Sequence, residues 1–240
     1  MKLKHSIFYG SLLALSLSAC NETKKTVDSP TVQIIGSLKE AIWKNQLTPL
    51  VSLDTLDLKH VYGVGPKAGL QGENITFDGI NYSITIDKGQ LKIAEDNKAT
   101  SPYFVFQKVP TWVKIKMDQP IENLYDLGTF VLSRKELLKN RESAVKIEGK
   151  FKGLEIAIHN LPDVVSQYTY AVALNTTQKY QLSDVEGTII GFFDAERTMR
   201  FSHHDEQLIL YYISKDKKTM GRITQLFYDK EDIQLYLPKY

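Results

Sequence analysis

The chain contains one cysteine, Cys20, among 240 residues. A single cysteine excludes an internal disulfide framework and a zinc ribbon built on cysteine ligands. Glycine (14 residues) and proline (8 residues) are few, and no internal repeat is present, which excludes collagen-like and repeat architectures. Beyond the first twenty residues, no apolar run is long enough to cross a bilayer as a helix. Ordinary core packing must therefore hold the fold together.

The chain also has almost no excess of one sign of charge over the other. The chain has 30 Lys and Arg against 28 Asp and Glu, and its 42% hydrophobic and 24% charged residues are globular values. Lys2 and Lys4 lie in the first 19 residues, so the remaining chain has 28 basic and 28 acidic residues and no formal net charge. We therefore expect no nucleic-acid partner, because such binding depends on clustered positive charge.

The first twenty residues have the pattern of a bacterial lipoprotein signal. A basic start is followed by the eleven residues Ile7–Leu17, mostly apolar and far short of the roughly 20 that a spanning helix needs. Leu17-Ser18-Ala19-Cys20 then resembles a lipobox. We predict a signal peptide at residues 1–19, lipidation of Cys20, a polar tether at residues 20–31 and a domain, or two subdomains, at residues 32–240. The expected location is the bacterial cell envelope, anchored to a membrane by lipid. A plain secretory signal with an incidental cysteine is the alternative.

The rest of the chain indicates an α+β, strand-rich fold. Ser37 followed by Glu40 forms a capping-box pattern, which predicts a helix at residues 38–45. Leucine spacing predicts further helices at residues 47–58 and 132–138.

Elsewhere the apolar residues recur with the period of two that is typical of strands. Asp78-Gly79 and Lys88-Gly89 predict hairpin turns. The run Leu208–Ile213 predicts a strand covered on both faces. The predicted strands are Thr31–Ile35, Ile75–Phe77, Tyr82–Ile86, Leu91–Ile93, Tyr103–Val109, Trp112–Met117, Val145–Phe151, Gly153–His159, Tyr168–Leu174, Val185–Phe193, Leu208–Ile213, Arg222–Tyr228 and Asp232–Leu237.

Several segments, in order through nearly the whole mature chain, together resemble the acetolactate decarboxylase family. They are Thr31–Lys39 (TVQIIGSLK), Tyr62–Gly65, Gly69–Glu73, Phe77–Tyr82, Ser101–Phe104, Ala144–Phe151, Val185–Phe192, Tyr212–Lys217 and Gly221. The resemblance implies the fold of that family. It also implies zinc-dependent decarboxylation of a 2-hydroxy-3-oxo acid to acetoin, in which the metal stabilises the charge released with carbon dioxide. In the family, three histidines hold the zinc: two in a His-x-His pair on one strand and a third eleven residues later.

Carried over residue by residue, the zinc site is not retained. With Ile213-Ser214 as the anchor, the two strand histidines fall at Ile209 and Tyr211, and the third falls at Arg222, eleven residues after Tyr211. Isoleucine has no ligand atom, and arginine carries a permanent positive charge. The active-site arginine of the family falls at Ala157.

Each of these positions has two interpretations. Glu73, which matches a family glutamate, is either a catalytic acid or a solvated turn residue. Ile209 and Tyr211 either line a converted ligand pocket or fill the core. Arg222 either binds a carboxylate, through two parallel hydrogen bonds, or is a surface residue at a turn.

A different metal site is the alternative. His203 and His204, followed by Asp205 and Glu206, form the one dense group of ligand-type residues, although neighbours on a strand point to opposite faces. His159, like His60, has no partner at metal-ligand spacing in the sequence. No serine or cysteine nucleophile motif and no phosphate-binding glycine loop are present.

Three functions follow from these patterns. The first is an envelope lipoprotein that has lost the zinc site, has no cofactor and binds a small molecule, such as a 2-keto or 2-hydroxy acid, or a partner protein. The second is an active acetolactate decarboxylase, with zinc held by His203 and His204 or without metal through Arg222. The third is a structural envelope lipoprotein, since fold alone does not imply function.

Overall fold

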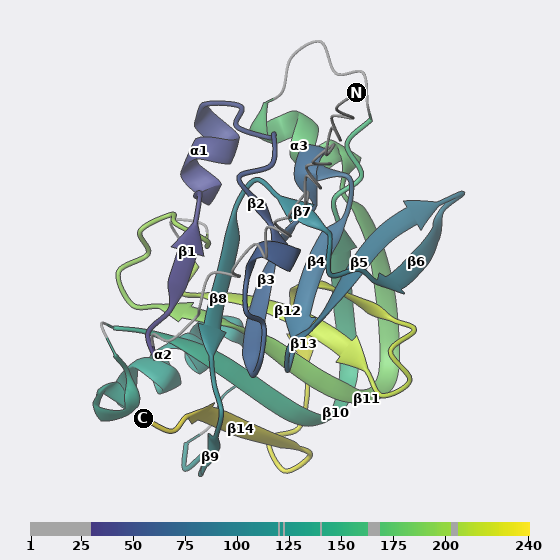
Figure 1. The fold of residues 1–240 in the computed structure, drawn as a ribbon. Helices are drawn as coiled ribbons and strands as arrows, with labels where there is room; N and C mark the ends of the chain where they lie inside the picture. The colour runs from purple at the N-terminus through teal and green to yellow at the C-terminus, as the bar shows by residue number, and fades with distance from the viewer. Residues whose placement is uncertain (1–29, 120, 122, 140, 163–168, 203–205) are drawn as a thin grey trace, which may run out of the picture.

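The computed structural model describes residues 30–119, 121, 123–139, 141–162, 169–202 and 206–240 (Figure 1). The predicted signal peptide, Cys20 and most of the tether lie outside these residues, as do His203 and His204. Among the described helices, none has the length and apolar character needed to cross a membrane.

The chain is built mainly from two six-stranded antiparallel sheets (Figure 1). The first sheet has the order β1-β8-β3-β4-β5-β6. Its strands are β1 (Gln33–Ile35), β3 (Val61–Pro66), β4 (Glu73–Phe77), β5 (Ile80–Asp87), β6 (Gln90–Glu95) and β8 (Phe104–Lys108). A small separate pair is formed by β2 (Val51–Ser52) and β7 (Thr100–Ser101).

The second sheet has the order β11-β12-β13-β10-β14-β9 and closes on itself, because β10 also pairs with β11. Its strands are β9 (Trp112–Ile115), β10 (Glu142–Ile158), β11 (Gln178–Asp194), β12 (Leu208–Ser214), β13 (Met220–Phe227) and β14 (Ile233–Pro238). The helices are α1 (Leu38–Trp43), α2 (Leu124–Ser133) and α3 (Tyr170–Thr176), with 3-10 turns at Leu53–Thr55, Ala68–Leu70 and Lys135–Leu137. The predicted α+β, strand-rich class is therefore confirmed.

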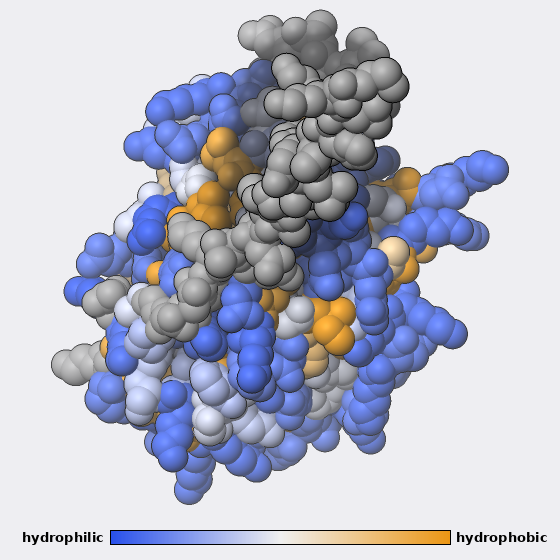
Figure 2. All heavy atoms as spheres, in the orientation of Figure 1, coloured by the Kyte–Doolittle hydropathy of each residue, from blue (hydrophilic) through white to orange (hydrophobic). Residues whose placement is uncertain are grey.

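Two apolar layers cover the second sheet. On one face, residues of β12 such as Ile209 and Ile213 pack against first-sheet residues such as Val64 and Ile75. On the other face, Leu210 and its neighbours pack against α2. Hydrophilic residues cover most of the described surface seen in Figure 2, and apolar residues show there only in small separate groups. The residues that face the first sheet therefore lie in a layer between two sheets.

A buried glutamine joins the two sheets. Gln107, on β8, is fully buried. Its Oε1 accepts a hydrogen bond of 2.7 Å from the backbone N–H of Ala144, on β10, and its Nε2 donates to the hydroxyl of Tyr240 at 2.9 Å and to the carbonyl of Pro30. This one side chain therefore ties both ends of the described domain to the layer between the sheets.

Several local predictions are confirmed. Ser37 caps α1 by accepting the N–H of Glu40 at 3.2 Å. Asp78-Gly79 and Lys88-Gly89 each connect two strands with positive φ at both residues, which is the requirement of the hairpin turn that their composition predicts.

Two local predictions are wrong, and one is right only in part. Residues 47–58 form β2 and a 3-10 turn rather than a helix. Of the helix expected at residues 132–138, residues 132 and 133 end α2 and Lys135–Leu137 form a 3-10 turn. The strand expected at residues 168–174 overlaps a helix, α3. In all three segments, short apolar runs fit both periods, and contacts elsewhere in the chain decide the outcome.

Candidate functional site

The three positions at which the resemblance expects zinc ligands lie together. Ile209 and Tyr211 alternate on β12 and pack in the layer between the sheets. Arg222, on β13, is the direct cross-strand partner of Tyr211. Neighbouring strands present directly paired residues on the same face of a sheet. The spacing read from the sequence therefore corresponds to one compact group in space.

Ala157 belongs to the same row. It pairs with Arg222 on the other side of β13, so that Ala157, Arg222, Tyr211 and Ile190 follow one another across β10, β13, β12 and β11. The guanidinium group that the resemblance expects at residue 157 is thus absent there and present one strand away. The interpretation of Arg222 as a surface residue at a turn is wrong, because Arg222 lies within β13 and is only partly exposed.

Glu73 faces this row from the first sheet. It is the first residue of β4 and is fully buried, so its interpretation as a solvated turn residue is wrong. Its Oε1 accepts from the backbone N–H of His159 at 3.1 Å and lies 2.6 Å from the ring Nδ1 of the same residue. Its Oε2 accepts from the hydroxyl of Tyr211 at 3.0 Å. Three donors therefore satisfy one buried carboxylate, as burial of a charged group requires.

His159 is the residue of this group that the sequence does not mark as functional. It lies directly after β10 and 86 residues from Glu73 along the chain. Nothing in the local pattern marks it, because the contact depends on how the two sheets meet. The ring of Tyr211 fills the core, and its hydroxyl belongs to the polar group around Glu73.

The electrostatics of the group favour a protonated tyrosine and a charged arginine. Burial raises the pKa of the Tyr211 hydroxyl well above its ordinary value, and the nearby Glu73 raises it further. Burial lowers the pKa of Arg222, but attraction to the acidic groups around it, Tyr211 in its ionised form first and then Glu73, more than offsets this and raises it. Tyr211 is therefore a hydrogen-bond donor at neutral pH, and Arg222 is a cation.

One polar atom of the group is unsatisfied. The Nε of Arg222 is buried, and it has no hydrogen-bond partner among the residues that the structure describes. Buried donors nearly always have an acceptor, so an unpaired one in a native fold calls for an explanation.

The side chains at positions 209, 211 and 222 do not fit a zinc ion. Ile209 offers no donor atom, and the charge of Arg222 repels a cation. A tyrosine ligates as the phenolate, whereas the Tyr211 hydroxyl keeps its proton and donates a hydrogen bond to Glu73. Over the described part of the chain, no three His, Cys, Asp or Glu side chains gather as potential metal ligands. The alternative ligands His203 and His204 lie outside that part.

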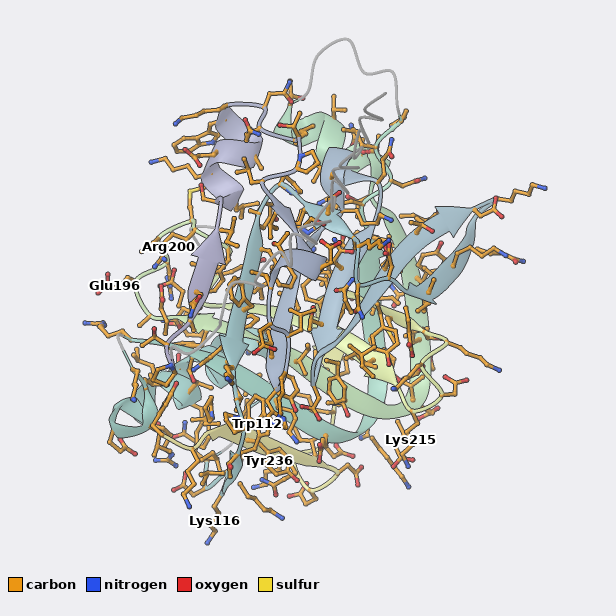
Figure 3. The ribbon with its side chains drawn as sticks, viewed as in Figure 1. Trp112, Lys116, Glu196, Arg200, Lys215 and Tyr236 are labelled. Carbon is orange, nitrogen blue, oxygen red and sulfur yellow. The ribbon has the colours of Figure 1, made fainter. Side chains whose placement is uncertain are left out.

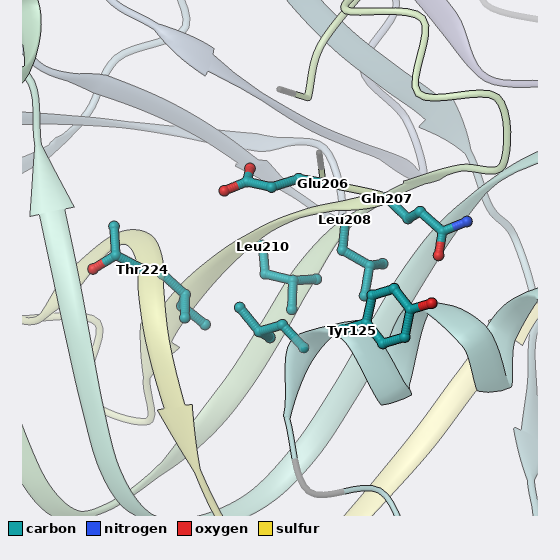
Figure 4. A pocket seen from close by; sticks show the side chains of 8 residues that line it. Tyr125, Glu206, Gln207, Leu208, Leu210 and Thr224 are labelled. Carbon is teal, nitrogen blue, oxygen red and sulfur yellow. The ribbon is translucent and has the colours of Figure 1, made fainter. Parts of the chain in front are cut away.

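A separate cavity lies on the opposite face of the second sheet. It measures about 230 Å³ and lies between the start of α2 and strands β12 and β13 (Figure 4). Leu208 and Leu210, which alternate with Ile209 and Tyr211 along β12, line it, and the exposed ring of Tyr125 stands beside them. The sheet itself therefore separates this cavity from the group around Glu73.

Aromatic side chains also lie around the ammonium group of Lys146, on β10. Its ammonium lies 5.4 Å from the ring centroid of Trp112 and 4.4 Å from that of Tyr236, two residues that Figure 3 shows near each other. Glu148 pairs with the ammonium at 2.7 Å. Lys146 is thus already satisfied, unlike Arg222.

Comparison with known proteins identifies the family. The sequence matches the family described as alpha-acetolactate decarboxylase over residues 34–237. It is 24% identical over 172 residues to an alpha-acetolactate decarboxylase of Streptococcus thermophilus, in a match that covers 68% of this chain and 65% of that protein.

Solved structures agree on the fold. The acetolactate decarboxylase of Bacillus subtilis strain 168 is similar with a TM-score of 0.69 and 19% identity, over 88% of this chain and 86% of that one. A Staphylococcus aureus protein of unknown function, described as similar to that enzyme, has a TM-score of 0.66 and 19% identity over the same shares. At such identities a structural match establishes the fold alone, but the family match covers most of the sequence. The chain therefore belongs to the alpha-acetolactate decarboxylase family.

Proposed function

We propose that this chain is an envelope lipoprotein that keeps the decarboxylase fold without the zinc chemistry and binds a small molecule at the group around Glu73. One observation carries the proposal: the three positions expected to ligate zinc hold Ile209, Tyr211 and Arg222, on one face of neighbouring strands. A catalytic zinc site needs three protein ligands with lone pairs and an open position. These three side chains offer an alkyl group, a hydroxyl that is already engaged and a cation.

The remaining polar residues favour a binding site over an apolar core. Complete loss of function would allow the buried polar group to be replaced by apolar side chains, at little cost in stability. Instead, Glu73 is buried with three hydrogen bonds, and a cation lies close to it. Such a group retains the capacity to recognise polar atoms of a ligand.

The anchor is part of the proposal and rests on the sequence. The lipobox-like Leu17-Ser18-Ala19-Cys20 would attach the chain to a membrane by lipid, and the polar tether after Cys20 would hold the domain beside it. Mass spectrometry of the intact protein from bacterial membranes tests this part. A chain that begins at an acylated Cys20 is expected, and an unmodified cysteine in a cut or uncut chain would contradict it.

Metal content and acetoin release test the loss of zinc chemistry. We expect the full chain, purified in mild detergent without chelator, to contain far less than one zinc per chain and to release no acetoin from acetolactate. The matched control is the triple variant Ile209→His, Tyr211→His and Arg222→His, which should gain zinc in proportion to protein. Stoichiometric zinc together with acetoin release by the unaltered chain would overturn the proposal and favour an active decarboxylase with ligands such as His203 and His204.

A further inference from the structure

A basic groove lies at the edge of the second sheet, where β9 ends and β14 begins. It measures about 490 Å³, and three of the described residues that line it are lysines: Lys114, Lys116 and Lys230. Among those lining residues, Glu231 supplies the one carboxylate, 3.8 Å from the ammonium of Lys230. Because residues 20–240 carry no formal net charge, this excess of positive charge is local. The groove is therefore suited to anionic groups.

The two lysines on the β9 side project away from the core. Lys114 and Lys116 are exposed and alternate with Ile115 and Met117, which pack into the apolar layer beside α2. β9 is also the last strand of the second sheet. Charged side chains on an edge strand, lysines above all, oppose pairing with a strand of another chain. A second copy of the protein is therefore a poor occupant of this edge.

Two partly buried aromatic residues accompany the lysines. Trp112 precedes Lys114 by two residues on β9, and Tyr236, on β14, is the direct cross-strand partner of Lys114. Figure 3 shows Trp112, Tyr236 and Lys116 at the same end of the domain. Tryptophan and tyrosine are enriched at the headgroup level of bilayers, and lysines interact there with anionic lipid. The side chains at this end thus fit a lipid surface.

The described domain begins at the same end. One glutamine side chain of β8 donates both to the carbonyl of Pro30 and to the hydroxyl of Tyr240. The backbone N–H of Lys239 donates to the carbonyl of Thr111, the residue before β9, at 2.9 Å, and Figure 1 shows β9, β14 and the C-terminus together. Residues 20–29 span at most about 33–36 Å when fully extended. A lipid at the start of that segment would therefore hold this end of the domain close to a membrane.

We propose that this end of the domain docks on a bilayer that contains anionic lipid, with headgroup phosphates beside Lys114, Lys116 and Lys230. The inference rests on the lipid anchor of the proposed function and adds the face that meets the membrane. Attraction between lysines and an anionic surface falls off within a Debye length, about 8 Å at physiological ionic strength. The anchor supplies the proximity that this short range requires, so a weak attraction is sufficient to orient the domain.

Lysine labelling of the acylated chain tests this face. The chain is reconstituted in phosphatidylcholine vesicles with or without phosphatidylglycerol, acetylated briefly and analysed by mass spectrometry. We expect Lys114, Lys116 and Lys230 to react about threefold or more slowly when phosphatidylglycerol is present, and the difference to disappear in 1 M salt, where the Debye length is about 3 Å. Lys92, exposed on β6, is the internal control and should react equally in both vesicles.

Equal rates at the three groove lysines in both vesicles, or equal slowing of Lys92, would overturn the inference. Inorganic phosphate added to phosphatidylcholine vesicles should leave the rates unchanged. Equal protection by phosphate would overturn docking on a membrane and favour a free anion. An unacylated Cys20 would overturn the anchor and this inference together, whereas an acylated chain with uniform labelling would overturn this inference alone.

A double variant then assigns the contact to β9. Lys114→Gln combined with Lys116→Gln should raise the reactivity of Lys230 in phosphatidylglycerol vesicles to its value in phosphatidylcholine, because the domain no longer docks. Lys92→Gln combined with Lys98→Gln removes two other exposed lysines and is the matched control, with protection of the groove retained. All four side chains are exposed, so both variants should keep the urea unfolding midpoint of the unaltered chain. Retained protection of Lys230 in the first variant would overturn the assignment.

Discussion

Replacing Gln107 by leucine should destabilise the domain strongly, because this side chain joins its two sheets. Gln107 is fully buried, and its Oε1 is the acceptor for the backbone N–H of Ala144. Leucine fills a similar volume but leaves that N–H unpaired, at a cost of about 1–3 kcal/mol. Loss of the bond to the Tyr240 hydroxyl adds about 0.5–1.5 kcal/mol. The free energy of unfolding should therefore fall by about 2–4 kcal/mol.

Urea unfolding followed by circular dichroism measures this difference, and thermal unfolding should show a midpoint lower by several degrees. Gln225→Leu is the matched control, since Gln225 is an exposed residue of β13 and its replacement should change stability by less than about 0.5 kcal/mol. Equal stability of the Gln107→Leu protein and the unaltered chain would refute the argument that this side chain supplies the link between the sheets.

Three further predictions concern the second sheet. Gly191→Ala should prevent folding or destabilise severely, seen as loss of soluble protein or of the unfolding transition, because a Cβ there would lie 1.9 Å from the carbonyl oxygen of Ile209. Tyr211→Phe should lower the free energy of unfolding in urea by about 1–3 kcal/mol, because it removes a donor to a buried carboxylate; an unchanged value would contradict the role given to that hydroxyl. A hydrogen bond from Lys179 is the largest of the causes that lower the pKa of Glu155. The unfolded chain then binds a proton more readily than the folded one, so the stabilisation is present above the ordinary glutamate range near 4.5 and is lost as the pH falls below it. The stability advantage of the unaltered chain over Glu155→Gln should therefore shrink between pH 5 and pH 3, and a constant difference would contradict this.

The elements predicted correctly from the sequence are those determined by neighbouring residues. The Ser37 cap and the Asp78-Gly79 and Lys88-Gly89 turns each depend on backbone geometry within four residues. The covered strand at β12 is also predicted, because its apolar run is bounded by polar residues on both sides. By contrast, β10 is one strand of 17 residues, which the sequence analysis divided after Phe151. Partners on both edges keep the strand continuous across that division.

The candidate site shows the same limit more sharply. Register counted from one anchor placed Ile209, Tyr211 and Arg222 on matching positions, because strand spacing is periodic and the two strands are joined by a short turn. His159 could not be found in this way, since its contact with Glu73 spans 86 residues and two sheets. The functional interpretation of Glu73 changed with that contact, from an isolated acid to the centre of a hydrogen-bonded group.

The contact also explains why a glutamate can remain buried at this position when the positions expected for zinc ligands hold other residues. A buried carboxylate without a nearby cation or several donors is strongly destabilising. Here His159 and Tyr211 provide three hydrogen bonds, and Arg222 provides the positive charge. The guanidinium group of Arg222 also has hydrogen-bonding capacity left over, because its buried Nε has no acceptor within the described part of the chain. A site that had become purely structural would gain stability by losing that unpaired donor, so its presence favours the proposal that this group binds a small molecule.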